Sequence, residues 1–363
     1  MGQQPQSTSH DVDVEALKAV HADAADLFRQ QLPSSWVPGY LATRRLEQSL
    51  QSDSAWSVGY APRSWTWLTE RLRHLGYSDA VLERSGLSIR TKNDTLVDRF
   101  RDRLTLGIRD VTGSLVGFTC RAAPNAGPRC PKYLNSPTTA IYRKSEVLFG
   151  LGELLRRGAD VGTPVLVEGP LDAIAVAPTG TGPYAPLAAC GTALTASHGD
   201  VITRLATGSE VVVALDSDAA GRQAATHALD LLRSCGIEPW ALLLPEGADP
   251  ADLARQSGPA ALSDALAGIR TPLVDIVVEN TIRAAGERLR WVEGQVSTAR
   301  MVMPLVASCS LLHAARLASK VARMCDLAPA TVADELAVEL ERTAGLAPKA
   351  GPATDVRRPI SRS

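Results

Sequence analysis

The stretch Val165-Leu-Val-Glu-Gly-Pro-Leu-Asp172 decides the fold class of this chain, together with Val213-Ala-Leu-Asp-Ser-Asp-Ala-Ala-Gly221 further along. Each stretch begins as an apolar run typical of a buried strand in a parallel sheet, and each ends abruptly in carboxylates and a glycine. In open α/β sheets, ligands bind beyond the carboxyl ends of the strands. We therefore expect Glu168, Asp216 and Asp218 to lie where such a fold places its chemistry.

Acidic side chains gathered at that edge predict a divalent cation site. The carboxylates of Glu168, Asp216 and Asp218 would repel one another unless a hard cation joined them. Magnesium, or manganese in its place, takes oxygen ligands and brings phosphates with it. Asp172 follows Glu168 by one helical turn, so it can return to the same edge as a ligand or a support. Alternatively, one aspartate only caps the helix that starts near Gly221.

The composition is that of a soluble globular protein, with 45% apolar and 21% charged residues among 363. The polar N-terminus does not resemble a signal peptide, and no apolar run approaches the roughly 20 residues of a membrane span. The six cysteines are scattered without a Cys-x-x-Cys pair, so we expect reduced thiols, no zinc site and a cytoplasmic protein.

The charges are unevenly distributed, although the net charge is only −1. Residues 60–150 contain 15 Lys and Arg against 8 Asp and Glu, whereas residues 151–260 contain 6 against 13. A basic face can follow nucleic-acid phosphates, and an acidic pocket can hold divalent metals. The alternative is that both segments are solvated surfaces with an accidental bias.

The order of the expected elements predicts an α/β protein with three folded parts. Strands expected at residues 165–167, 187–189, 211–215 and 241–244 alternate with helices, which indicates a doubly wound parallel sheet. The predicted domains are a disordered end (1–14), a basic mixed α+β subdomain (15–150), the doubly wound domain (151–265), a helical subdomain (266–345) and a disordered tail (346–363).

Shorter sequence patterns predict individual helices, a hairpin and a helix cap outside the doubly wound domain. Residues 64–87 predict two helices broken near residue 77, with Ser78 capping the second. Residues 103–121 predict a hairpin around Asp110-Val-Thr-Gly113. Thr331 is expected to cap the last helix.

The two acidic stretches resemble the TOPRIM domain, which bacterial primases, type IA and II topoisomerases and several nucleases share. The shared pattern is a glutamate after one strand and Asp-x-Asp after another. In this chain, Glu168 stands at the glutamate position, and Asp216 and Asp218 form the pair.

Blocks in the basic segment narrow the resemblance to the RNA polymerase core of bacterial DnaG-type primases. The resemblance runs from about Asp13 to Arg342. The blocks that carry it are Val58-Gly-Tyr-Ala-Pro62, Asp98-Arg-Phe-Arg-Asp-Arg103, Gly117-Phe-Thr-Cys-Arg121, Pro131-Lys-Tyr-Leu-Asn-Ser-Pro137 and Leu148-Phe-Gly-Leu151.

The resemblance implies a set of nucleic-acid and nucleotide contacts. Basic side chains beside an aromatic suit single-stranded nucleic acid, since they combine backbone charge with base stacking. For each basic residue the alternative is surface solvation, and for the tyrosine it is core packing. The implied contact residues are Arg44, Arg121, Lys132, Tyr133, Asn135 and Lys144.

This chain departs from the family pattern at two places. Asp249 matches a further metal-binding aspartate, but the family's Asp-Pro-Asp reads Asp249-Pro-Ala-Asp252 in this chain. Asp252 either substitutes as a metal ligand or only favours the first turn of the next helix. Arg45 replaces the glycine expected after Arg44.

The resemblance implies a DNA primase that makes short RNA primers on single-stranded DNA from nucleoside triphosphates, by metal-dependent nucleotidyl transfer. Glu168 would be a metal ligand or a general base. Such primases carry a zinc-ribbon domain and a helicase-binding domain, whose patterns this sequence lacks, so we expect a helicase or zinc-module protein to act in trans. The alternatives are a TOPRIM nuclease and a non-catalytic nucleic-acid-binding accessory of a mobile element.

Overall fold

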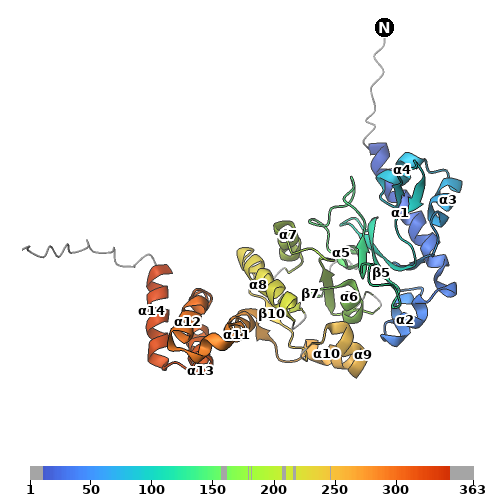
Figure 1. Ribbon diagram of the computed structural model, residues 1–363. Coiled ribbons are helices and arrows are strands. Elements are labelled where there is room, and N and C mark those ends of the chain that lie inside the picture. The colour runs from blue at the N-terminus through green and yellow to red at the C-terminus, as the bar shows by residue number, and fades with distance from the viewer. Residues whose placement is uncertain are drawn as a thin grey trace, which may run out of the picture. The chain divides into compact units, whose positions relative to one another are not determined.

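The computed structural model describes residues 11–156, 162–178, 180, 182–206, 210–215, 218–245 and 247–343. The chain divides into two compact units, with the boundary in the sequence between Leu273 and Val274 (Figure 1). The first helix, α1 (Asp11–Gln30), begins inside the segment expected to be disordered. Asp216 and the predicted tail lie outside the described residues.

The basic segment is built on an antiparallel sheet with the order β1-β4-β5-β6. The predicted hairpin is confirmed: Ile108 pairs with Gly117, and Leu106 with Thr119. A register shift after Ile108 makes Leu115 pair with Arg109 instead of with an apolar partner. The strands are β1 (Val58–Ala61), β4 (Arg103–Arg109), β5 (Leu115–Ala122) and β6 (Tyr133–Asn135).

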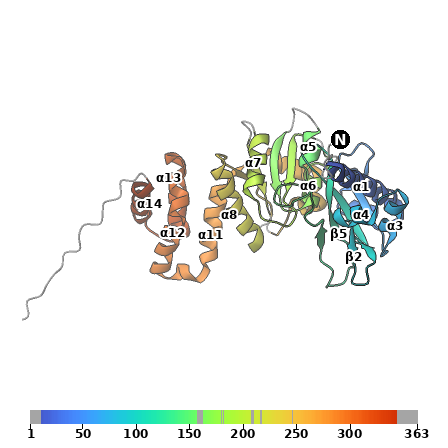
Figure 2. The same cartoon turned by 90° about the horizontal axis from the view of Figure 1, so that it is seen from above.

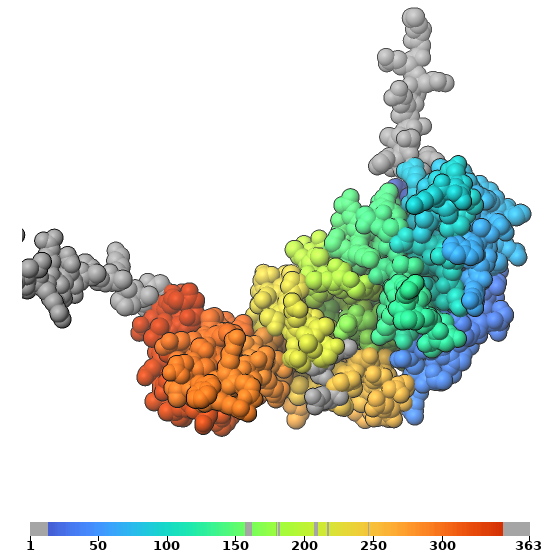
Figure 3. Space-filling view, in the orientation of Figure 1, coloured from blue at the N-terminus to red at the C-terminus, as the bar shows by residue number. Residues whose placement is uncertain are grey.

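Both faces of this sheet are buried, so β4 is buried along nearly its whole length although apolar residues alternate with polar or small ones in its sequence. On one face, Phe118 of β5 packs with Phe28 of α1. On the other, Leu106 of β4 belongs to the same core cluster as Val165, which lies in the second sheet. Because that core is continuous, the basic segment and the strand–helix segment form one unit, as the blue-to-yellow surface in Figure 3 shows.

The second sheet has the order β11-β10-β9-β7-β8, with all but its edge strand β11 parallel. This confirms the predicted doubly wound α/β fold. The predicted strand at 241–244 is much shorter, because β9, its neighbour, ends at Ala214. The strands are β7 (Thr163–Val167), β8 (Tyr184–Ala188), β9 (Val212–Ala214), β10 (Trp240–Ala241) and β11 (Thr271–Pro272).

The strand order reverses between β7 and β9. The chain moves from β7 to β8 on one side, and then crosses back to place β9 on the other side of β7. Such a switch point opens a crevice at the carboxyl ends of the strands. Glu168 follows β7 directly, and Asp218 follows β9, so the topology brings these two chain segments to the same edge.

Helices begin where the sequence predicts them after each parallel strand. Pro170 starts α6, and Thr195 caps α7 through a bond from the His198 amide to its hydroxyl. Figure 2 shows the helices around the sheet. Their bounds are α5 (Leu151–Leu155), α6 (Pro170–Val176), α7 (Ala196–Leu205), α8 (Ala219–Ser234), α9 (Pro250–Ser257) and α10 (Pro259–Ala267).

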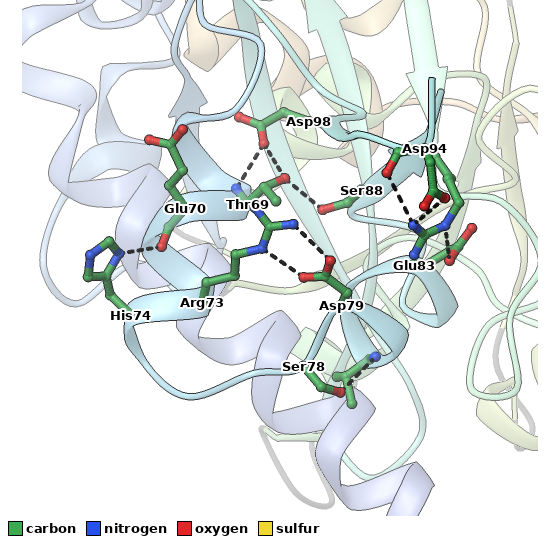
Figure 4. A network of polar contacts seen from close by, with 12 residues as sticks. Thr69, Glu70, Arg73, His74, Ser78, Asp79, Glu83, Ser88, Asp94 and Asp98 are labelled. Atoms are coloured by element: carbon green, nitrogen blue, oxygen red, sulfur yellow. Dashed lines mark hydrogen bonds and ion pairs between the residues drawn. The ribbon is translucent and has the colours of Figure 1, made fainter. Parts of the chain in front are cut away.

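A polar network fixes the outer part of the basic segment (Figure 4). Buried Asp98 accepts hydrogen bonds from the amides of Leu68 and Thr69. These amides lie in the first turn of α3, where the helix itself provides no acceptor for them. Ser78 caps α4 as predicted, accepting from the Val81 amide. The remaining elements are η1 (Leu32–Ser34), α2 (Val37–Thr43), η2 (Glu47–Leu50), α3 (Trp67–His74), α4 (Asp79–Arg84), β2 (Ser88–Arg90) and β3 (Leu96–Asp98).

The second unit is helical, as predicted. Buried Asp275 accepts from Arg316 at 2.8 Å and contacts His313, which ties its first helix to its third. The prediction for Thr331 is wrong: α14 already begins at Pro329, which suits a first helical turn. Its helices are α11 (Leu273–Ala285), η3 (Gly286–Arg290), α12 (Val292–Ala307), α13 (Leu311–Met324) and α14 (Pro329–Thr343). None of the helices described is both long and apolar enough to cross a membrane.

Arg45 has a left-handed backbone, with φ of 57°, which explains why a glycine is expected after Arg44. We expect Arg45→Gly to raise the free energy of unfolding by about 0.5–1 kcal/mol, because it removes the clash of the Cβ in this conformation. Arg45→Ala is the control, since it removes the guanidinium but keeps the Cβ. Equal urea midpoints for the two variants would show that the backbone is not strained.

Candidate active site

A cavity of about 170 Å³ lies at the edge of the second sheet, where the basic segment meets the loops after β7 and before α9. It brings together side chains that are up to 208 residues apart in sequence, from Arg44 to Asp252. Predicted site residues make up most of its lining, which consists of Arg44, Arg121, Lys132, Tyr133, Glu168, Gly169, Leu171, Asp172, Asp249, Ala251 and Asp252.

Part of the cavity lining is cationic and ordered by aromatic rings. The guanidinium of Arg121 lies 5.2 Å from the ring centre of Tyr40 and 5.5 Å from that of Tyr133. Arg121 also donates from Nη1 to the Tyr133 hydroxyl at 3.3 Å. Its buried Nε has no hydrogen-bond partner among the described residues. Arg121 is therefore held in place by its contacts with the two tyrosines.

Tyr40 is a site residue that the sequence interpretation missed. Its ring lies 5.0 Å from the Arg44 guanidinium and 5.2 Å from that of Arg121, so it supports both cations. The Tyr40–Arg44 spacing of four residues on one helix was the available signal. Burial raises the pKa of Tyr40 and the pKa of Tyr133, so both hydroxyls stay neutral at physiological pH.

The cavity is also lined by acidic side chains. The Glu168 side chain is exposed and has no hydrogen-bond partner among the described residues. Asp249 caps α9 by accepting from the Asp252 amide with Oδ1 at 2.5 Å. Its Oδ2 takes no part in this hydrogen bond. Carboxylate oxygens of this kind are the donors that magnesium prefers.

Asp172 is buried and links the two acidic loops. Its Oδ2 accepts from the Gly169 amide at 3.1 Å, and its Oδ1 accepts from the Ala251 amide at 3.2 Å. Both oxygens are thus engaged by backbone donors. This geometry favours the supporting role of Asp172 over that of a metal ligand.

Asp252 has a partner of its own. Its Oδ1 accepts from Nη2 of Arg255 at 3.0 Å and from Nε at 3.2 Å, in the first turns of α9. The contact favours the helix-start interpretation, although Asp252 still lines the cavity.

Asp218 caps α8, accepting from the Gly221 amide at 2.8 Å, and does not line the cavity. Capping uses one oxygen, so a metal contact through the other remains open to this exposed side chain. Asp216, which would complete the pair, lies outside the described residues. Within the described ranges, no three acidic, histidine or cysteine side chains form a group that could hold a metal ion.

Asn135 and Lys144 are not among the residues that line the cavity. The Asn135 amide donates to the carbonyl of Cys190 at 2.9 Å, which ties β6 to the loop after β8. The Lys144 carbonyl accepts from His198 of α7 at 3.0 Å. Both contacts hold the basic segment against the second sheet.

Comparison with known proteins identifies related folds and sequences. Residues 27–155 match the family described as "DNA primase catalytic core, N-terminal domain", and residues 165–254 match the "Toprim-like" family. A DNA primase of Streptomyces coelicolor is 36% identical over 273 residues, which cover 73% of this chain and 42% of the relative. The chain thus spans less than half the length of that curated relative.

Solved structures cover more of the chain. The RNA polymerase domain of Mycobacterium tuberculosis primase DnaG is 32% identical with a TM-score of 0.69, covering 85% of this chain and 98% of that domain. A DnaG primase catalytic domain bound to single-stranded DNA is 27% identical with a TM-score of 0.68, covering 88% and 98%.

Proposed function

This chain belongs to the family of DNA primase catalytic cores, and we propose that it is a DNA-templated RNA polymerase that makes short RNA primers on single-stranded DNA. The supporting observation is the cavity at the switch point, which is lined by both cationic and acidic side chains. Such a cavity suits a nucleoside triphosphate, because the cations attract the phosphates and the carboxylates can hold the magnesium that accompanies them.

Each set of side chains has a distinct role in this proposal. Arg44, Arg121 and Lys132 bind phosphates of the nucleotide or template, with Tyr133 beside them. Magnesium or manganese held by Glu168 and Asp249, with Asp216 and Asp218, would supply charge neutralisation to the triphosphate when bound. Glu168 is either one of these ligands or the base that accepts the proton of the attacking hydroxyl.

One assay separates this proposal from its alternatives. The protein is incubated with single-stranded DNA, the four ribonucleoside triphosphates and magnesium or manganese, and labelled nucleic acid is resolved by length. A primase makes new RNA, a TOPRIM nuclease shortens the DNA, and a non-catalytic binding protein changes neither. Absence of RNA products with either metal would refute the proposed function.

The basic residues proposed to contact phosphates, Arg121 and Lys132 of the cavity and Lys144 outside it, predict a specific salt dependence. We expect Arg121→Ala, Lys132→Ala and Lys144→Ala each to weaken binding of single-stranded DNA or ATP. A lost DNA phosphate contact should flatten the slope of log K against log salt by about 0.7. Arg323→Ala, which changes an exposed arginine of α13, is the control. Wild-type affinity for both ligands in all three variants would show that these residues are solvated surface residues without a role in binding.

Asp252 and Asp249 should respond differently to loss of charge. We expect Asp252→Asn to change the half-maximal magnesium concentration less than tenfold, because Arg255 already engages its carboxylate. Asp249→Asn should raise it tenfold or more, which corresponds to about 1.4 kcal/mol of metal binding. Magnesium titration of primer synthesis measures both. A tenfold rise for Asp252→Asn would instead identify Asp252 as a recruited metal ligand.

A further inference from the structure

The segment that carries Lys144 is held by the first turn of α7. The Thr195 hydroxyl donates to the carbonyl of Ser145 at 2.6 Å, and His198 Nε2 contacts the carbonyl of Lys144 at 3.0 Å. The same two residues bond each other: the Thr195 amide meets His198 Nδ1 at 3.2 Å, and the His198 amide meets the Thr195 hydroxyl at 3.3 Å. We call these two residues the Thr195–His198 clamp.

The partners of His198 fix its tautomer. The Lys144 carbonyl can only accept, so Nε2 must carry a proton. The Thr195 amide can only donate, so Nδ1 must be unprotonated. Both contacts therefore exist together only in the neutral Nε2–H form. The imidazole is completely buried, and this burial lowers the pKa of His198, which favours the neutral ring.

The clamp is itself anchored to the helix that follows the second acidic motif. His227 of α8 contacts the carbonyl of Leu194 at 2.6 Å through Nε2, immediately before Thr195. On the other side of the Lys144 segment, Phe149 exchanges two backbone hydrogen bonds with Ala188 of β8. The backbone from residue 144 to residue 149 is thus fixed at one end to the start of α7 and at the other to β8.

We propose that His198 is a positioning residue, which fixes the backbone that carries Lys144 through its Nε2–H tautomer. The inference rests on the proposed role of Lys144 as a phosphate contact. A lysine on a long, flexible side chain binds a phosphate tightly only when its backbone is fixed, because an unfixed backbone adds to the ordering that binding requires. The clamp supplies that fixation from a different part of the fold.

Two substitutions distinguish the two hydrogen bonds that the His198 imidazole makes, one with the Lys144 carbonyl and one with the Thr195 amide. His198→Gln places an amide donor near the Nε2 position, so it can still donate to the Lys144 carbonyl. His198→Asn places an amide oxygen near the Nδ1 position, so it can accept from Thr195 but does not reach Lys144. We expect His198→Asn to weaken binding of magnesium ATP or of oligothymidylate about threefold to tenfold, the usual effect of one lost hydrogen bond. His198→Gln should lie closer to wild type.

A double-mutant cycle with Lys144→Ala distinguishes positioning from general stability. If His198 acts through Lys144, the difference between the Asn and Gln variants disappears when Lys144 is alanine. His74→Asn is the matched control, since His74 is exposed and, among the described residues, its ring bonds the Glu70 carbonyl of its own helix. Equal losses from His198→Asn with and without Lys144, or no effect of Lys144→Ala on either ligand, would overturn the inference.

The tautomer gives a readout that is independent of primer synthesis. Nitrogen-15 spectra of the histidine rings in the wild-type protein should show His198 with a protonated Nε2 and an unprotonated Nδ1 at neutral pH. An Nδ1–H form would refute the positioning role, whatever the enzyme makes. A protein that shows the coupling and the tautomer but makes no primers would refute the proposed function alone.

Discussion

Asp218→Asn should abolish nucleotide addition and leave the free energy of unfolding within about 0.5 kcal/mol of wild type. Asparagine caps helices as well as aspartate does, so it can still accept from the Gly221 amide and start α8. It lacks the negative charge that a metal ligand must supply. Primer synthesis at saturating magnesium and urea unfolding together measure the two effects.

Two further variants complete the test of Asp218. Asp218→Ala should be equally inactive and also less stable by about 1 kcal/mol, because it removes the cap. Asp230→Asn, on an exposed position of the same helix, should behave as wild type. If Asp218→Asn retained more than about a tenth of the wild-type rate, the metal assignment would be wrong, since a lost ligand costs several kcal/mol at the transition state.

Asp172→Ala should lower the free energy of unfolding by about 2–4 kcal/mol and abolish primer synthesis. The substitution leaves the amides of Gly169 and Ala251 without their acceptor in a buried site. The loops that carry Glu168 and Asp249 then lose the side chain that joins them. Thermal or urea unfolding measures the first effect, and the primer assay the second.

Magnesium dependence shows whether Asp172 supports the site or binds the metal. For a supporting residue, the activity lost in Asp172→Asn is not restored by excess magnesium, whereas the loss in Asp249→Asn is partly restored. Asp172→Ala with wild-type stability would contradict the linking role. Recovery of Asp172→Asn at high magnesium would identify it as a ligand.

The sequence by itself determined the fold class and most elements. The apolar runs before Glu168 and Asp216 mark buried parallel strands, because a strand covered on both faces has no polar alternation. The turn before Asp79 is marked by Ser78, whose hydroxyl satisfies a helix donor locally. The motif blocks also indicated the family, because they consist of particular residue types at particular spacings, and both can be seen in the sequence alone.

Only the tertiary structure decided what each acidic oxygen contacts. From the sequence, Asp172 could be a metal ligand or a support one turn after Glu168, and one of its oxygens meets the amide of Ala251, 79 residues away. Asp252, which the sequence left as either a substitute ligand or a helix-start residue, is engaged by Arg255.

The same is true of the supporting residues. Tyr40 lies between Arg44 and Arg121 only because α2 and β5 are brought together by packing. His198 reaches the Lys144 carbonyl across 54 residues of chain. A sequence pattern fixes residue type and local geometry, whereas a hydrogen bond or stacked ring depends on angstrom-scale approach between distant segments, which the packed core sets.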